Sequence, residues 1–146
     1  MKSREFLDQL DHKRIVAAIA SAEKRTSGEI RVFIERVDVA ADPLFFAEGK
    51  FLELGMQQTA ERNAILIFVA PRAQKFAVVG DEGIHRQCGP EFWQHLVAAM
   101  RGHFQRAEFT DALVEAIETA GNALGQYFPR RSDDQNELSD QIIEGK

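Results

Sequence analysis

The feature of the sequence that most constrains the fold is Ala64–Ala70, a run of seven consecutive apolar residues. A run this short and this apolar predicts a strand covered on both faces, because a strand with one wet face would alternate polar and apolar side chains. Residues 71–74 read as a turn, and Lys75–Gly80 reads as a returning strand. Because a connection this short permits only a hairpin, we expect these two strands to be antiparallel.

A further strand is predicted at residues 29–35, where polar and apolar side chains alternate with a period of two. This alternation indicates one strongly buried face and therefore an outer strand. Between it and Ala64–Ala70 the sequence predicts a helix that begins at Asp42-Pro43, since Asp caps helices and Pro suits the first helical position. A strand, a helix and a strand in this order indicate a right-handed parallel crossover. The buried stripe of this helix is expected to comprise Leu44, Phe45, Ala47, Phe51 and Leu52, with Gly55 closing the helix.

Three more helices are expected around the strands. One is capped by Asp11, one begins at Pro90, and one is capped by Thr110-Asp111 and stops at Phe128-Pro129. This order of elements predicts a three-layer α/β/α sandwich, in which a small mixed sheet carries helices on both faces.

The chain of 146 residues is long enough for one domain with its own core. We assign residues 1–129 to this domain and residues 130–146 to a flexible acidic tail with three basic and five acidic residues. The apolar pair Ile142-Ile143 offers the tail a weak docking point.

Composition excludes some partners and locations. The formal net charge of −5 argues against a nucleic-acid partner held mainly by phosphate contacts. Acids interrupt the N-terminal region where a signal peptide needs an apolar stretch, and no run approaches the roughly 18 apolar residues of a membrane span. The single cysteine, Cys88, excludes an internal disulfide and fits a reducing compartment. We expect a cytoplasmic protein without membrane insertion.

The predicted topology gathers chemistry-bearing residues at one edge of the sheet. The start of the first strand, the start of the second and the end of the third meet there, which brings residues 26–29, 61–63 and 80–83 together. Carboxylates in a glycine-flanked turn, here Asp81 and Glu82, are ligands that calcium or magnesium prefers. A solvated acidic turn is the alternative interpretation, because the alternating Asp and Asn ligands of a complete calcium loop are absent.

The chain has four histidines, and none shows the spacing of metal ligands. His85 follows the acidic turn directly, and a histidine beside carboxylates is readily tuned toward acid/base chemistry. His95 and His103 stand on one predicted helix without the spacing of metal ligands, so we expect structural roles for them.

With these residues in view, the chain resembles the TPM domain family, in a short cytosolic bacterial form. The resemblance runs from about Leu10 to Phe128. It is carried by Glu23 with residues 26–30, residues 47–55, Thr59 with residues 62–67, the turn at residues 80–85, and Phe92-Trp93.

The resemblance implies a Rossmann-like three-layer sandwich. Members of the family have been proposed as acid phosphatases and as calcium-binding modules, and many have no assigned activity. Family members often carry an Asp before the third helix, where this sequence reads Gln87-Cys88-Gly89-Pro90. This departure weakens the transfer of metal binding and of phosphatase activity to this chain.

Two functions remain open from the sequence. In one, the domain is an interaction module that binds another protein, and binding of a divalent metal stays open for this module. In the other, it is a metal-dependent phosphohydrolase with Asp81, Glu82 and Glu29 as metal ligands, Arg62 on the phosphate and His85 as proton donor. We favour the module, because these residues complete no known catalytic constellation.

Overall fold

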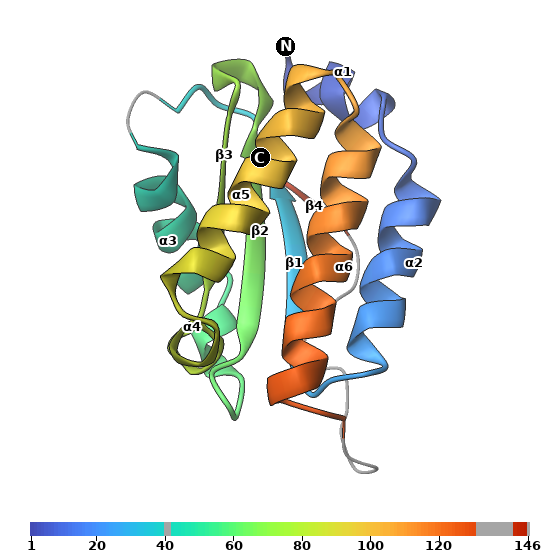
Figure 1. The fold of residues 1–146 in the computed structure, drawn as a ribbon. Coiled ribbons are helices and arrows are strands. Elements are labelled where there is room, and N and C mark those ends of the chain that lie inside the picture. Colours follow the sequence, from blue (N-terminus) through green and yellow to red (C-terminus); the bar gives the residue numbers. More distant parts are fainter. Residues whose placement is uncertain (40–41, 131–141, 146) are drawn as a thin grey trace.

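The computed structural model describes residues 1–39, 42–130 and 142–145. Its centre is a four-stranded sheet of order β3-β2-β1-β4 (Figure 1). The strands are β1 (Glu29–Ile34), β2 (Ala64–Ala70), β3 (Lys75–Gly80) and β4 (Ile143–Glu144). β1 is parallel to β2 and to β4, whereas β2 and β3 are antiparallel. The predicted crossover and hairpin are both confirmed.

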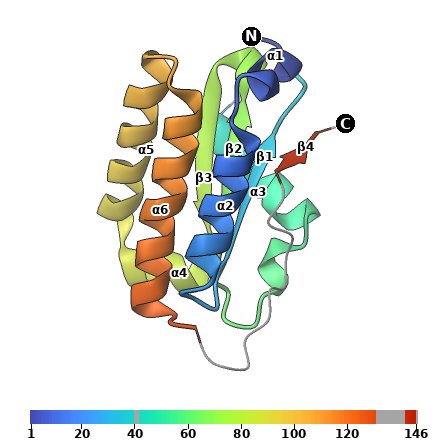
Figure 2. The same ribbon diagram turned by 90° about the vertical axis from the view of Figure 1, so that its right-hand side faces the viewer.

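Helices lie on both faces of this sheet, so the three-layer α/β/α sandwich is confirmed. α2, α5 and α6 cover one face and α3 covers the other (Figure 2). The helices of the described part of the chain are α1 (Ser3–Asp8), α2 (His12–Glu23), α3 (Pro43–Glu53), α4 (Glu82–Cys88), α5 (Pro90–Gln105) and α6 (Phe109–Tyr127), with short 3-10 turns at Met56–Gln58 and Pro71–Ala73. α1 was not predicted from the sequence; it is a helix of six residues, and its Phe6 and Leu7 side chains are buried.

β2 supplies both halves of the core. All of its side chains are buried, as the apolar run predicted. Ile65 and Ile67 pack in the cluster beneath α2, α5 and α6, whereas Leu66 and Phe68 pack in the cluster beneath α3. Alternate side chains of one strand thus hold the two outer layers together.

The predicted caps of α2 and α3 are confirmed. The Asp11 carboxylate accepts a hydrogen bond from the backbone N–H of Arg14 at 3.1 Å, and Asp42 accepts one from Leu44 at 3.0 Å. The predicted cap of α6 is wrong, because that helix already begins at Phe109. The Thr110 hydroxyl instead accepts the N–H of Asp11 at 3.0 Å, which joins the starts of α2 and α6.

β1 is not the outer strand that its alternation predicted. β4 pairs with it at Phe33 and Ile34, and the carboxylate of Glu23 accepts the N–H of Ile30 at 2.8 Å. Glu29 at its start is buried as well. Period-two alternation failed here because a charged side chain can be buried when neighbouring charges accompany it.

The C-terminal tail contributes β4. Its docking residues Ile142 and Ile143 are half-buried, and the N–H of Gly145 donates to the carbonyl of Ile34 at 2.9 Å. The predicted flexibility of the tail falls mainly on residues 131–141, which lie outside the described residues.

The predicted buried stripe of α3 is only partly right. Ala47 and Phe51 are buried, but the exposed fractions of Leu44, Phe45 and Leu52 are 43%, 71% and 59%. The helix contacts the sheet through Ala47 and Phe51, which are four residues apart and lie on one side of it. Apolar residues on the other sides of the helix therefore remain in solvent. Gly55 has φ +73° and takes the left-handed position predicted for it.

We expect Gly83→Ala to lower stability by about 2 kcal/mol, the usual cost of overpacking. A Cβ atom at Gly83 would lie 2.3 Å and 2.5 Å from the carbonyl oxygens of Glu61 and Arg62. Gly49→Ala, in α3, is the matched control. No atom lies within 4 Å of its new Cβ, so the gain in helix propensity of about 1 kcal/mol should raise stability. Equal urea midpoints for the two variants would contradict this packing.

Candidate functional site

The three loops predicted to meet at one edge of the sheet do meet. The N–H of Asp81 donates to the carbonyl of Ala64 at 2.9 Å, and the N–H of Gly83 donates to that of Arg62 at 2.8 Å. On the other side, the Asn63 amide donates to the Ser27 hydroxyl at 3.1 Å. Hydrogen bonds therefore link the ends of β1, β2 and β3 into one polar surface.

The central contact of this surface is a two-pronged ion pair between Arg62 and Asp81. Arg62 Nε donates to Asp81 Oδ2 at 2.7 Å, and Nη2 donates to Oδ1 at 2.9 Å. The Asp81 side chain is only 5% exposed, whereas that of Arg62 is 43% exposed. Hydrogen bonding to Asp81 raises the pKa of the Arg62 guanidinium. Both carboxylate oxygens of Asp81 are thus engaged by one cation.

Asp81 also begins a helix that the sequence analysis took for a glycine turn. Its Oδ1 accepts the N–H of Glu82 at 2.8 Å, and residues Glu82–Cys88 form α4. The turn interpretation failed because Gly83 suggests a loop, yet here it allows α4 to pack directly against the backbone of residues 61–62.

The other candidate residues take different positions around this pair. Glu82 is 58% exposed, and its Oε1 lies 3.6 Å from Arg62 Nη1. The His85 ring is stacked on Trp93 with ring centroids 5.9 Å apart. In the described residues the His85 ring makes no hydrogen bond to Asp81 or Glu82, so the proton donor and the carboxylates are not brought together in this geometry.

Glu29 stands on a different strand from Asp81. It is paired in register with Ala64, so β2 lies between it and the end of β3. Burial lowers the pKa of Arg31, and the nearby carboxylates of Glu29 and Glu23 oppose that shift. Glu29 therefore belongs electrostatically with Arg31, at the start of β1.

Ser27 and Asn63 lie at this edge as predicted, and they form a hydrogen-bonded chain that the sequence did not indicate. The Ser27 hydroxyl donates to Glu61 Oε1 at 3.3 Å and accepts from Asn63, whose backbone N–H donates to the Thr59 hydroxyl at 3.2 Å. Polar residues directly before an all-apolar strand were the available signal. No histidine of the described chain is bonded to Ser27, so Ser27 lacks the base that a serine nucleophile requires.

A divalent cation would use Asp81 here only by displacing Arg62. Within residues 1–39, 42–130 and 142–145, no three Asp, Glu, His or Cys side chains come together as a ligand set. As arranged, with Arg62 on both oxygens of Asp81, the described residues do not fit a metal ion. Metal binding by Asp81, Glu82 and Glu29 stays a prediction.

Comparison with known proteins agrees with the fold. The family profile described as the TPM domain matches residues 1–123. The chain belongs to the TPM domain family. No curated protein matches it.

Solved structures that resemble this TPM domain include two determined by NMR. The NMR structure of the BA42 protein from the psychrophilic bacterium Bizionia argentinensis is 40% identical, with a TM-score of 0.84 over 92% of both chains. The solution NMR structure of the N-terminal domain of the cg2496 protein from Corynebacterium glutamicum is 14% identical, with a TM-score of 0.61 over 87% of this chain and 78% of that one. The second likeness concerns the fold alone.

None of the helices in the described part of the TPM domain combines the length and apolar character needed to cross a membrane.

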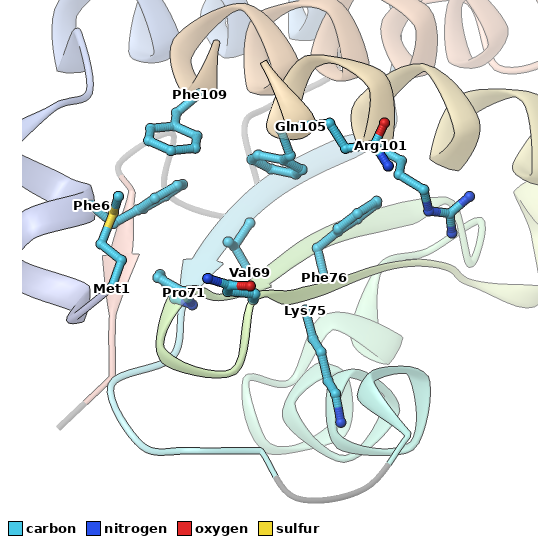
Figure 3. A pocket seen from close by; sticks show the side chains of 11 residues that line it. Met1, Phe6, Val69, Pro71, Lys75, Phe76, Arg101, Gln105 and Phe109 are labelled. Atoms are coloured by element: carbon cyan, nitrogen blue, oxygen red, sulfur yellow. The ribbon is translucent and has the colours of Figure 1, made fainter. Parts of the chain in front are cut away.

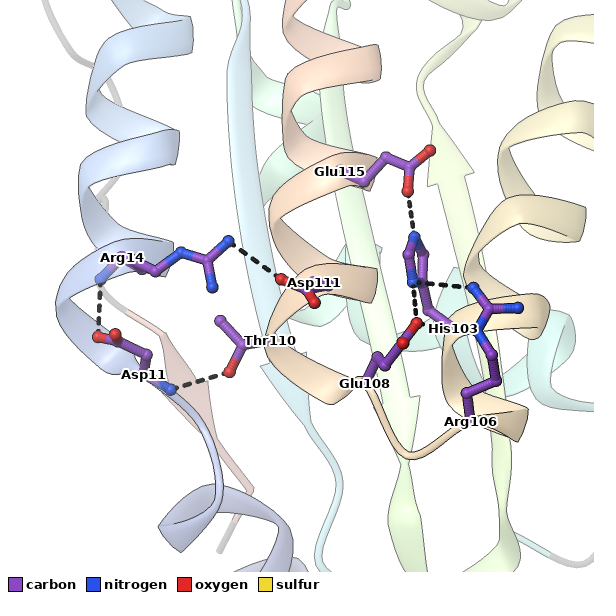
Figure 4. Close-up of polar contacts among 8 residues, drawn as sticks. All are labelled: Asp11, Arg14, His103, Arg106, Glu108, Thr110, Asp111 and Glu115. Carbon is purple, nitrogen blue, oxygen red and sulfur yellow. Dashed lines mark hydrogen bonds and ion pairs between the residues drawn. The ribbon is translucent and has the colours of Figure 1, made fainter.

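A second polar cluster connects α5 with α6 (Figure 4). His103 Nδ1 lies 2.8 Å from Glu108 Oε1, and His103 Nε2 is hydrogen-bonded to Glu115. Hydrogen bonding to Glu108, and then to Glu115, raises the pKa of His103. Arg106 lies 3.3 Å from Nδ1 and opposes protonation, but two carboxylates outweigh one guanidinium. His103 therefore has a structural role in which its side chain links α5 to α6.

We expect His103→Gln to destabilise the TPM domain more at pH 6 than at pH 9. A raised pKa in the folded state means that the stabilisation is fully present below the ordinary value of 6.5 and is lost as pH rises through the raised value. His95→Gln, an exposed histidine on the same helix, is the control. Thermal melts across this range test the difference, and an identical pH dependence for both variants would contradict the link.

Arg62 and a divalent cation would compete for the carboxylate of Asp81. Because Arg62 holds both carboxylate oxygens, we expect Arg62→Gln to bind calcium more tightly at this edge than the native domain does. Asp81→Asn should remove that binding. Calcium titrations followed by amide chemical shifts of residues 80–85 measure it, and equal affinities in the native and Arg62→Gln proteins would place any cation elsewhere.

Proposed function

We propose that this TPM domain is a protein-binding module that acts through the outward side of α3. The observation that carries the proposal is the exposure of large apolar side chains on this one helix. The exposed fractions are 43% for Leu44, 71% for Phe45, 38% for Phe46 and 59% for Leu52. We call these four residues the α3 face.

The α3 face differs from isolated apolar residues on a surface. Phe45 and Phe46 pack edge to face with ring centroids 5.9 Å apart, so they form one apolar unit in solvent. Grouped apolar side chains of this kind mark binding surfaces, whereas scattered ones need no explanation. Aromatic residues are also the side chains that contribute most to binding at protein interfaces.

The charges around the α3 face favour a basic partner. Asp42 and Glu48 are exposed beside it. Lys50 is engaged by Glu53 at 3.1 Å and lies 4.7 Å from the centroid of the Phe33 ring, so acids dominate the rim. A second copy of the chain would bring acids against acids, and an anionic membrane would be repelled as well. A partner segment with apolar residues flanked by Lys or Arg fits best.

Phosphohydrolase activity at residues 80–83 is the alternative hypothesis. It receives less support, because Asp81 is engaged by Arg62 and the His85 ring is stacked on Trp93. The cytoplasmic location expected from the sequence stays a prediction.

A synthetic amphipathic helical peptide, with leucines along one side and flanking lysines, tests the module. We expect it to shift the amide signals of α3 and to bind less tightly as salt increases. Phe45→Ser should weaken binding about fivefold or more, the effect of removing an interface anchor.

Two controls accompany this titration. Tyr127→Ser removes an exposed aromatic residue at the end of α6 and should leave the affinity unchanged. The same peptide with glutamates in place of lysines should bind more weakly. Shifts confined to residues outside α3, or no loss of affinity in Phe45→Ser, would overturn the proposal.

A further inference from the structure

A cavity of about 500 Å³ lies at the end of the sheet opposite to Asp81. It is bordered by α1, by the connection between β2 and β3, by the end of α5 and by the start of α6 (Figure 3). Its volume falls in the range of small-molecule sites. It is separate from the α3 face and from the Arg62–Asp81 pair.

Four phenylalanines line the cavity. The ring centroids of Phe6 and Phe109 are 5.0 Å apart, and those of Phe76 and Phe104 are 4.9 Å apart. Phe6 and Phe104, at 6.3 Å, connect the two pairs. Val69 contributes to the same lining. Such a wall favours an apolar or aromatic ligand body.

One cation stands beside this apolar wall. The Arg101 guanidinium lies 6.0 Å from the centroid of the Phe76 ring, and Arg101 is exposed. In the described part of the chain, no acid forms an ion pair with Arg101. The other cationic side chain, Lys75, donates to the carbonyl of Val39 at 3.3 Å and points away from the rings (Figure 3).

We propose that this cavity binds a small amphipathic monocarboxylate. The apolar body of the ligand contacts the four phenylalanine rings, and its carboxylate pairs with Arg101. Arginine suits this position because its planar guanidinium binds a carboxylate through two parallel hydrogen bonds while it stacks on an aromatic ring. A neutral ligand of the same shape would leave Arg101 without its partner, so the charge is the basis of selectivity.

Calorimetric titration of the full chain with octanoate and with 1-octanol tests the proposal. We expect octanoate to bind more tightly than octanol. Arg101→Gln should weaken octanoate binding about tenfold, the size expected for a hydrogen bond between charged groups, and should leave octanol unaffected. Arg86→Gln, which removes the same charge from the exposed surface of α4, should change neither affinity.

Gln105→Trp is the second variant. Gln105 is exposed and borders the cavity, so a bulky ring at this position narrows the cavity without disturbing the core. It should reduce the binding of both ligands, and amide spectra confirm that the variant is folded. The proposal is overturned by the absence of octanoate binding at millimolar concentration, by equal affinities for octanoate and octanol, or by unchanged octanoate binding in Gln105→Trp.

Discussion

The fold depends on the burial of β2 from both sides. A strand whose seven side chains are all buried needs a partner on each edge and a layer on each face. β1 and β3 occupy its edges, and the two helical layers cover its faces. The order of the elements around β2 then decides which loops meet at each end of the sheet. The polar surface at one end and the aromatic cavity at the other are both consequences of this arrangement.

At the polar end of the sheet, the charged side chains of Arg62 and Asp81 stabilise the fold. Asp81 neutralises Arg62, caps α4 and, through its backbone N–H, continues the pairing of β3 with β2. Gly83 then lets α4 lie directly on the backbone of residues 61–62. These interactions depend on one another, because the ion pair positions the residue that starts the helix. Such a surface explains why acids gather at this edge without a requirement for catalysis.

On the α3 face and at the cavity, side chains remain accessible to other molecules. On the α3 face, Phe45 is exposed to solvent, although this side chain could contribute to a core. At the cavity, Arg101 lies beside aromatic rings, and no acid of the described residues forms an ion pair with it. An exposed aromatic side chain forgoes the stabilisation that burial would provide, and the exposed Arg101 guanidinium is accessible to an anionic ligand. Both features therefore support functions that depend on contact with other molecules.

The sequence by itself determined the strands β1 to β3, their directions and the meeting of residues 61–63 with residues 80–83, because hydrophobic period and connection length are local properties. It also placed the caps Asp11 and Asp42. The tertiary structure alone decided that β4 pairs with β1, that Phe45 faces solvent, and that Glu29 is buried beside Arg31. It also built the aromatic cavity from Phe6, Phe76, Phe104 and Phe109, which come from three separate parts of the chain. These outcomes depend on how much surface each layer leaves uncovered, a quantity that exists only once the layers have packed.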